Sequence, residues 1–224
     1  YVFQFETGLE SYTGRRPYFD FRDDFLEFIP NHKPAFEFYS DNLDVKNLEF
    51  SVYKLPSAEE FLSSYQKSRK WSLGWGYYYR RYTSSLYQPK PETKIISFNP
   101  APIKVGYEQF IEVPQILENG YYLIDVKFKD ALYGEKHRQA WLQITPLANY
   151  FSITNSQGLL WVNDFEKKTA VEGIEAFYIE GADKINLGKT DEEGLIRFAA
   201  PEKLKSQSSN NIIEPQFFQA EHNQ

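Results

Sequence analysis

The chain contains no cysteine and no methionine among its 224 residues. The missing cysteine excludes disulfide bonds, thiolate ligands for zinc and cysteine nucleophiles. It leaves the cellular compartment open, because many envelope proteins also lack cysteine. Position 1 is a tyrosine, from which we expect an excised or processed piece of a longer protein.

The chain also has no excess of positive charge and no long apolar run. The 25 basic and 31 acidic side chains leave a net charge of −6, which does not attract a phosphate backbone, so we expect no nucleic-acid partner. No stretch reaches the roughly 18 uncharged apolar residues of a membrane span. The first residues, YVFQFETG, lack the basic start of a leader peptide, and any export signal is expected to lie outside this fragment.

Aromatic residues are abundant instead. The chain has 19 Phe and 17 Tyr, and 42% of its residues are hydrophobic, which suits strands and fills ordinary protein interiors without a cofactor. Its length fits two domains of about 100 residues each.

Short apolar runs between Pro, Gly, Asn and Asp clusters predict a β protein. In the first half the predicted strands are 35–40, 48–55, 93–99, 107–113, 121–129 and 138–145. Alternation in the fifth run predicts one core-facing set of side chains, namely Tyr122, Ile124, Val126 and Phe128. A capping box, Ser57 with Glu60, begins a helical pattern that predicts one helix over residues 58–69.

After Pro146 the chain begins a second series of six short runs, which indicates a second antiparallel sandwich. We therefore predict an all-β fold of two Ig-like β-sandwich domains, residues 1–147, with the inserted helix near 58–69, and 148–224. An alternative for the second domain is that a closing strand lies beyond its last residue. Within it, LGKTDEEGLIRF (187–198) predicts a hairpin turn, with Asp191 accepting backbone hydrogen bonds and Gly194 supplying a positive φ.

The order of phrases in the second half resembles the macroglobulin-like domains of the bacterial alpha-2-macroglobulin family. The family's order is LLVWV-x-D, then P-V-x-G-A, then LG-x-TD-x-x-G-L-x-F. The residues at the corresponding positions are Leu159, Leu160, Trp161, Val162, Asp164, Val171, Gly173, Ile174, Leu187, Gly188, Thr190, Asp191, Gly194, Leu195 and Phe198. The chain departs from the pattern at Ala170, where Pro is usual, and at Ile174, where Ala is usual. The likeness covers residues 140–200 well and the first half more loosely.

The resemblance implies structural scaffold domains of a protease-trapping inhibitor in the cell envelope, periplasmic or extracellular and membrane-anchored in the full-length protein. It implies two kinds of partner: neighbouring macroglobulin-like domains of the same chain, and host or competitor proteases for the full-length protein. Family members often carry a reactive thioester. GYEQ at 106–109 is similar in letters to that site, but without a thiol it cannot form one, and we predict a strand there.

A second functional hypothesis concerns the segment 70–88. If extended, it places Trp71, Trp75, Tyr77 and Tyr79 on one face, with Tyr82 opposite. Such a face suits packing on its own sheet or on a neighbouring domain. It also suits a surface carbohydrate- or peptide-binding module that uses residues 71–82.

Other chemistry is poorly supported by the sequence. His32, His137 and His222 stand singly in polar surroundings and are predicted to be solvated rather than to bind metal. Calcium binding by Asp191 and Glu193 is an alternative to the turn, although the D-x-D-x-D-G spacing is absent. No nucleophile with its base can be assembled, so we predict no enzyme and no cofactor.

Overall fold

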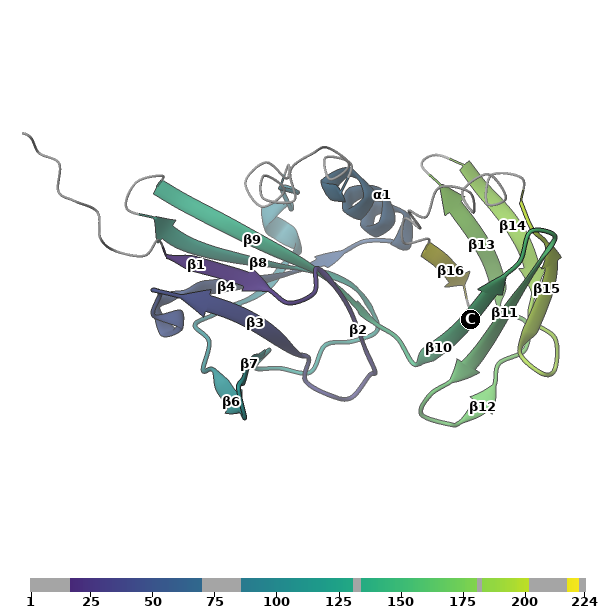
Figure 1. Ribbon diagram of the computed structural model, residues 1–224, viewed down its shortest axis with the longest axis horizontal. Coiled ribbons are helices and arrows are strands. Elements are labelled where there is room, and N and C mark those ends of the chain that lie inside the picture. Colours follow the sequence, from purple (N-terminus) through teal and green to yellow (C-terminus); the bar gives the residue numbers. More distant parts are fainter. Residues whose placement is uncertain (1–16, 70–85, 131–133, 181–182, 202–216, 222–224) are drawn as a thin grey trace, which may run out of the picture.

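The computed structural model describes residues 17–69, 86–130, 134–180, 183–201 and 217–221. These residues form two β-sandwiches side by side, with the single described α-helix between them (Figure 1). That helix has 12 residues, and a bilayer span takes about 20. Within the described ranges, therefore, no helix could cross a membrane.

The first sandwich is made of two β-sheets and the helix, and strands that are neighbours in a sheet are mostly not consecutive in the sequence. One sheet has the order β1-β3-β7-β6, with bounds Tyr18–Phe21, Ala35–Asp41, Glu108–Glu112 and Ile103–Val105. The other has the order β2-β9-β8-β4-β5, with bounds Phe25–Phe28, Gly134–Ile144, Gly120–Asp130, Glu49–Leu55 and Lys94–Phe98. The helix α1 spans Ala58–Arg69, and two 3-10 turns cover Val45–Asn47 and Pro91–Thr93.

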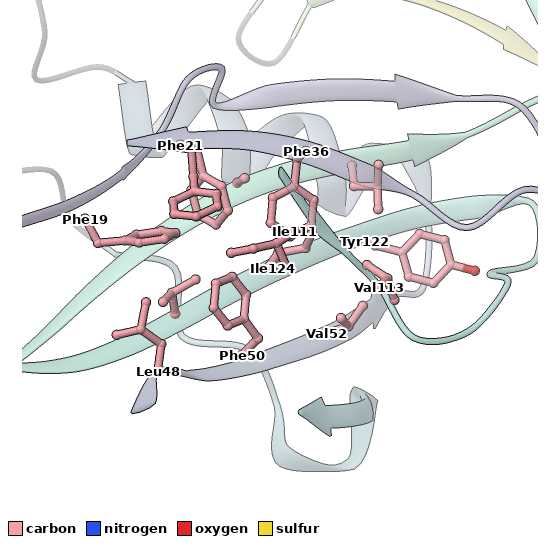
Figure 2. Packing of buried hydrophobic residues seen from close by; sticks show 14 of the residues in the cluster. Phe19, Phe21, Phe36, Leu48, Phe50, Val52, Ile111, Val113, Tyr122 and Ile124 are labelled. Atoms are coloured by element: carbon pink, nitrogen blue, oxygen red, sulfur yellow. The ribbon is translucent and has the colours of Figure 1, made fainter. Parts of the chain in front are cut away.

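Phenylalanine rings from both sheets fill the core of the first sandwich (Figure 2). Phe19 stacks on Phe38 with ring centroids 5.4 Å apart, and it meets Phe50 of the facing sheet edge-on at 5.7 Å. The alternation predicted for the run 121–129 is confirmed, because Tyr122, Ile124, Val126 and Phe128 all lie in this core. Leu123 and Asp125, on the opposite face of β8, are buried as well.

The helix is predicted correctly from 58 to 69, and its start has a simple cause. Ser57 Oγ accepts a hydrogen bond from the Glu60 N–H at 3.2 Å, which caps the first turn. Phe61, Leu62 and Tyr65 then lie on one side of α1 and are buried. They pack on Trp141 and Leu123 of the outer sheet face, so this face is covered rather than exposed to water.

The second sandwich has its own hydrophobic core, formed by buried residues between Leu160 and Ile196. One sheet contains β10, β11, β12 and β15, with bounds Leu147–Ile153, Gln157–Asp164, Thr169–Ala170 and Leu195–Ala199. The other has the order β14-β13-β16, with bounds Asp183–Lys189, Glu175–Glu180 and Phe217–Glu221. The boundary predicted near residue 147 coincides with the start of β10, and the division into domains stays a prediction.

The turn at 191–194 has the predicted local structure. Asp191 Oδ1 accepts hydrogen bonds from the Glu193 and Leu195 N–H groups at 3.0 and 2.8 Å. Gly194 has φ +73. The hairpin, however, is wrong: β14 pairs with β13 and β15 pairs with β11, so the turn carries the chain from one sheet to the other. A tight turn is a local feature, whereas the partners of its strands are chosen by the whole core.

Replacing Gly194 with Ala should strongly destabilise the second sandwich. A Cβ there would lie 2.4 Å from the Val162 carbonyl oxygen, in addition to the positive φ. Gly173→Ala is the matched control, because Gly173 has φ +78 and open space around it. We expect a loss of roughly 3 kcal/mol for Gly194→Ala and roughly 1 kcal/mol for Gly173→Ala in urea unfolding. Equal losses would show that the close approach to β11 is unimportant.

Candidate functional site

The aromatic residues predicted for binding, Trp71, Trp75, Tyr77, Tyr79 and Tyr82, all lie outside the described residues. Carbohydrate or peptide binding by the segment 71–82 therefore stays a prediction. The described residues point to a different site, the junction between the two sandwiches.

The covalent link across the junction is short and held on both sides. Only Thr145 and Pro146 separate β9 from β10. The Thr145 N–H donates to the Phe28 carbonyl in the first sandwich at 3.0 Å, and the Pro146 carbonyl accepts from the Phe165 N–H in the second at 2.8 Å. Because both linker residues are bonded to a sandwich, the link acts as a pivot with little slack.

The helix α1 forms a second point of contact. Ile179 of β13 packs against the hydrophobic cluster that α1 forms with the sheet, which includes Phe61 of the helix and Trp141 of β9. Lys184 Nζ lies 3.8 Å from Glu59 Oε1 in the first turn of the helix. The same ammonium lies 4.0 Å from the centre of the Phe177 ring, a cation–π arrangement that orients it.

A third contact lies at the opposite side of the pivot. Asn31 Nδ2 donates to Glu166 Oε1 at 3.2 Å. In Figure 1 the β2–β3 loop and the β11–β12 turn, which carry these residues, lie along the lower edge, and α1 lies along the upper edge. Contacts on both sides of a pivot oppose bending in either direction, so this arrangement favours one angle between the sandwiches.

Tyr87 ties the helix to the sheet beneath it. Its backbone forms two hydrogen bonds with the side-chain amide of Gln139, at 3.0 and 2.9 Å, and its hydroxyl donates to Glu60 Oε1 at 2.6 Å. Its ring also packs on Trp141, with centroids 5.6 Å apart. Burial, together with the hydrogen bond to Glu60, raises the pKa of the Tyr87 hydroxyl to about 12.

His137 is not the solvated histidine that the sequence predicts. Its Nδ1 lies 2.9 Å from Asp125 Oδ2 and its Nε2 lies 3.0 Å from Glu135 Oε1. The hydrogen bond from His137 lowers the pKa of Glu135. The buried Asp125 also accepts from Gln139 Nε2 at 3.0 Å, so the group braces the sheet face next to Tyr87. His32 is exposed as predicted, and His222 lies outside the described residues.

Ligands for a metal do not come together in the part of the chain that the structure describes, where no three His, Asp or Glu side chains form a group that could hold an ion. The strand predicted around GYEQ begins at Glu108. Gly106 and Tyr107 instead form the two-residue turn between β6 and β7, with Val105 paired to Glu108. Gly106 has φ +64 there, as such turns require.

Sequence reasoning missed the residues that make the junction. Ile179, Lys184 and Glu166 belong to runs that pattern analysis reads as strand or loop, and the polar partners of Lys184 and Glu166 lie more than 100 positions away. The acidic first turn of the helix has its own cause, because carboxylates are stabilised at a helix N-terminus. Nothing local therefore indicated that a lysine would pair with Glu59.

Removing the Tyr87 hydroxyl should lower stability and change its dependence on pH. Tyr87→Phe loses the bond to Glu60, which we expect to cost roughly 1 kcal/mol near neutral pH. Folding favours the neutral hydroxyl, because its pKa is raised from 10.0 to about 12. Its contribution is therefore complete below pH 10 and declines as pH rises through about 12.

The measurement is the midpoint of urea unfolding for the wild type, Tyr87→Phe and Tyr107→Phe from pH 8 to 11. The advantage of the wild type over Tyr87→Phe should shrink above pH 10, while Tyr107→Phe, which alters a fully exposed ring, should match the wild type throughout. A constant difference between wild type and Tyr87→Phe would contradict this assignment.

Comparison with known proteins places the fold. No family model matches the chain, and no curated protein matches it. A crystal structure of native alpha-2-macroglobulin from Escherichia coli spanning domains NIE-MG1 is similar, with a TM-score of 0.55 and 11% identity, over 85% of this chain and 90% of that one. The structure spanning MG0-NIE-MG1 has the same TM-score and identity, over 84% of this chain and 59% of that one.

At this identity the likeness shows the fold. Both sandwiches take part in it, since the matched share of 85% exceeds what either sandwich could supply alone. The structures similar to this chain are thus domains of bacterial alpha-2-macroglobulin, and the chain has a two-sandwich architecture of macroglobulin-like, Ig-type form.

Proposed function

We propose that the chain is a structural scaffold of a protease-trapping inhibitor similar to bacterial alpha-2-macroglobulin. The observation that carries the proposal is the three-point junction, in which the pivot at Pro146, the helix contact at Lys184 and the loop contact at Glu166 hold two sandwiches at one angle. The likeness to a pair of neighbouring domains of the Escherichia coli protein supports it.

A scaffold of this kind works by keeping neighbouring domains at a fixed angle to one another, so that they move as one body. When a protease cuts a bait segment elsewhere in the trap, rigid neighbours move together and a local change becomes a large displacement. A junction held on two sides suits that task, because it resists rotation while each sandwich keeps its own core. The role needs no covalent chemistry in this chain, and the chain has no cysteine from which to build a thioester.

The proposal extends to partners and place. The partners would be neighbouring macroglobulin-like domains of a longer chain, and the proteases that the complete inhibitor meets. The complete protein would stand in the cell envelope, anchored to a membrane and facing the periplasm or the exterior.

Rigidity of the junction is testable with single substitutions. Lys184→Ala and Ile179→Ala should broaden the distribution of angles between the sandwiches, seen as unequal alignment tensors in residual dipolar couplings. Lys189→Ala is the matched control, because Lys189 pairs with Glu175 inside the second sandwich at 3.1 Å. Thermal stability of Lys184→Ala should change by less than about 1 kcal/mol, since exposed ion pairs contribute little.

Two outcomes would contradict a fixed junction. The wild type could already show independent alignment of its sandwiches, or the Lys184 and Ile179 variants could match the Lys189 control.

Trapping is tested with the product of the complete reading frame and a broad-specificity protease. We expect activity on a small chromogenic peptide to persist while activity on casein falls, because a trapped protease keeps an open active site. Loss of both activities would indicate active-site inhibition instead, and loss of neither would reject the trap. The protease assay tests trapping alone, and the residual dipolar couplings test the rigidity of the junction independently of its outcome.

A further inference from the structure

Two aromatic rings lie exposed side by side on the second sandwich. Tyr150 of β10 and Trp161 of β11 are direct cross-strand partners, and they are 60% and 43% exposed. Leu160 and Val162, the strand neighbours of Trp161, lie in the buried core. Tyr150 is paired directly with Trp161, so both rings occupy the outer face of the sheet. Exposed large rings on an adjacent pair of strands are typical of binding surfaces.

The indole ring is held in one orientation. Trp161 Nε1 donates a hydrogen bond to the Glu193 backbone carbonyl at 3.0 Å. Trp161 is also paired in register with Leu195 of β15, so its backbone is held from both sides. A ring that is already ordered loses little conformational entropy when a partner binds to it.

The bond to Glu193 brings the acidic turn next to the ring. In this turn Asp191 is used for structure, because its Oδ1 accepts two backbone N–H groups and its Oδ2 lies 4.0 Å from Arg197. Glu192 and Glu193 are exposed, and within the described residues neither carboxylate forms an ion pair. Three carboxylates against one guanidinium leave the rim of the aromatic pair negative.

We propose that Tyr150, Trp161 and the turn 191–193 form a docking surface for an arginine-bearing, extended segment of a partner polypeptide. A guanidinium stacks on an indole face by cation–π attraction and donates to a carboxylate with its edge. The surface offers both groups together. This inference does not depend on the proposed trapping function.

The charge of the rim selects this partner over others. Anionic membranes and nucleic acids would be repelled by Glu192 and Glu193. A neutral sugar would stack on the rings but gain nothing from the net charge, so its binding would not depend on those carboxylates.

The test is calorimetric titration of the 224-residue chain with the peptide acetyl-Gly-Arg-Gly-Arg-Gly-amide at low ionic strength. The matched peptide carries citrulline at both arginine positions, which keeps the shape and removes the charge. We expect saturable binding of the arginine peptide and at least about tenfold weaker binding of the citrulline peptide. Added salt should weaken the arginine peptide alone.

Variants locate the binding. Trp161→Ala should weaken the arginine peptide about tenfold and Glu192→Gln with Glu193→Gln about threefold to tenfold. Phe165→Ala removes an exposed ring elsewhere on the same sandwich and should bind like the wild type. If Trp161→Ala is poorly folded by circular dichroism, the double glutamine variant decides, because both carboxylates lie outside the hydrogen bonds of the turn.

Three results would overturn the proposal. The peptides with arginine and citrulline could bind equally, the double glutamine variant could keep full affinity, or cellohexaose could bind while the arginine peptide does not. The last result would point to a saccharide platform.

Discussion

The arrangement of the whole molecule depends on covering the indole of Trp141. This ring stands on the outer face of the central sheet, where the chain would otherwise present Leu123, Tyr53 and Trp141 to water. Phe61 and Tyr65 of α1 cover it, with centroids 5.5 and 5.9 Å away. Burying a large apolar side chain contributes about 1.5–3 kcal/mol to folding stability, so these contacts fix the position of the helix on the sheet. In this position the helix presents Glu59 to Lys184 of the second sandwich.

The two tryptophans in the described residues differ in whether another element packs over them, and this decides whether each serves the core or the surface. Trp141 is 2% exposed and serves packing, whereas Trp161 is 43% exposed and holds its orientation through one backbone carbonyl. Both stand on outer sheet faces flanked by buried strand neighbours. The difference is that a helix lies over the first sheet, while the charged turn 191–193 borders the second. The same residue type therefore supports the core in one sandwich and a surface in the other.

Much of the fold could be predicted from local patterns. The helix start at Ser57, the inward set of β8 and the geometry of the turn at Asp191 were all predicted correctly, because each is decided within a few residues. The strands β1, β2, β6 and β12 were missed. They have two to four residues, too few for an alternation to stand out, and β2 pairs in parallel with β9, for which no turn signals the partner.

The sequence by itself determined the β class, the helix at residues 58–69, the lack of a thiol and the local shape of the turn at Asp191, since backbone preference and alternation act over short distances. Tertiary structure alone decided that β14 and β15 belong to different sheets, that His137 lies between two carboxylates, and that Ile179 meets the aromatic cluster under α1. Those outcomes depend on which apolar faces bury one another. Burial is shared among residues far apart in the chain, and no single segment carries that information.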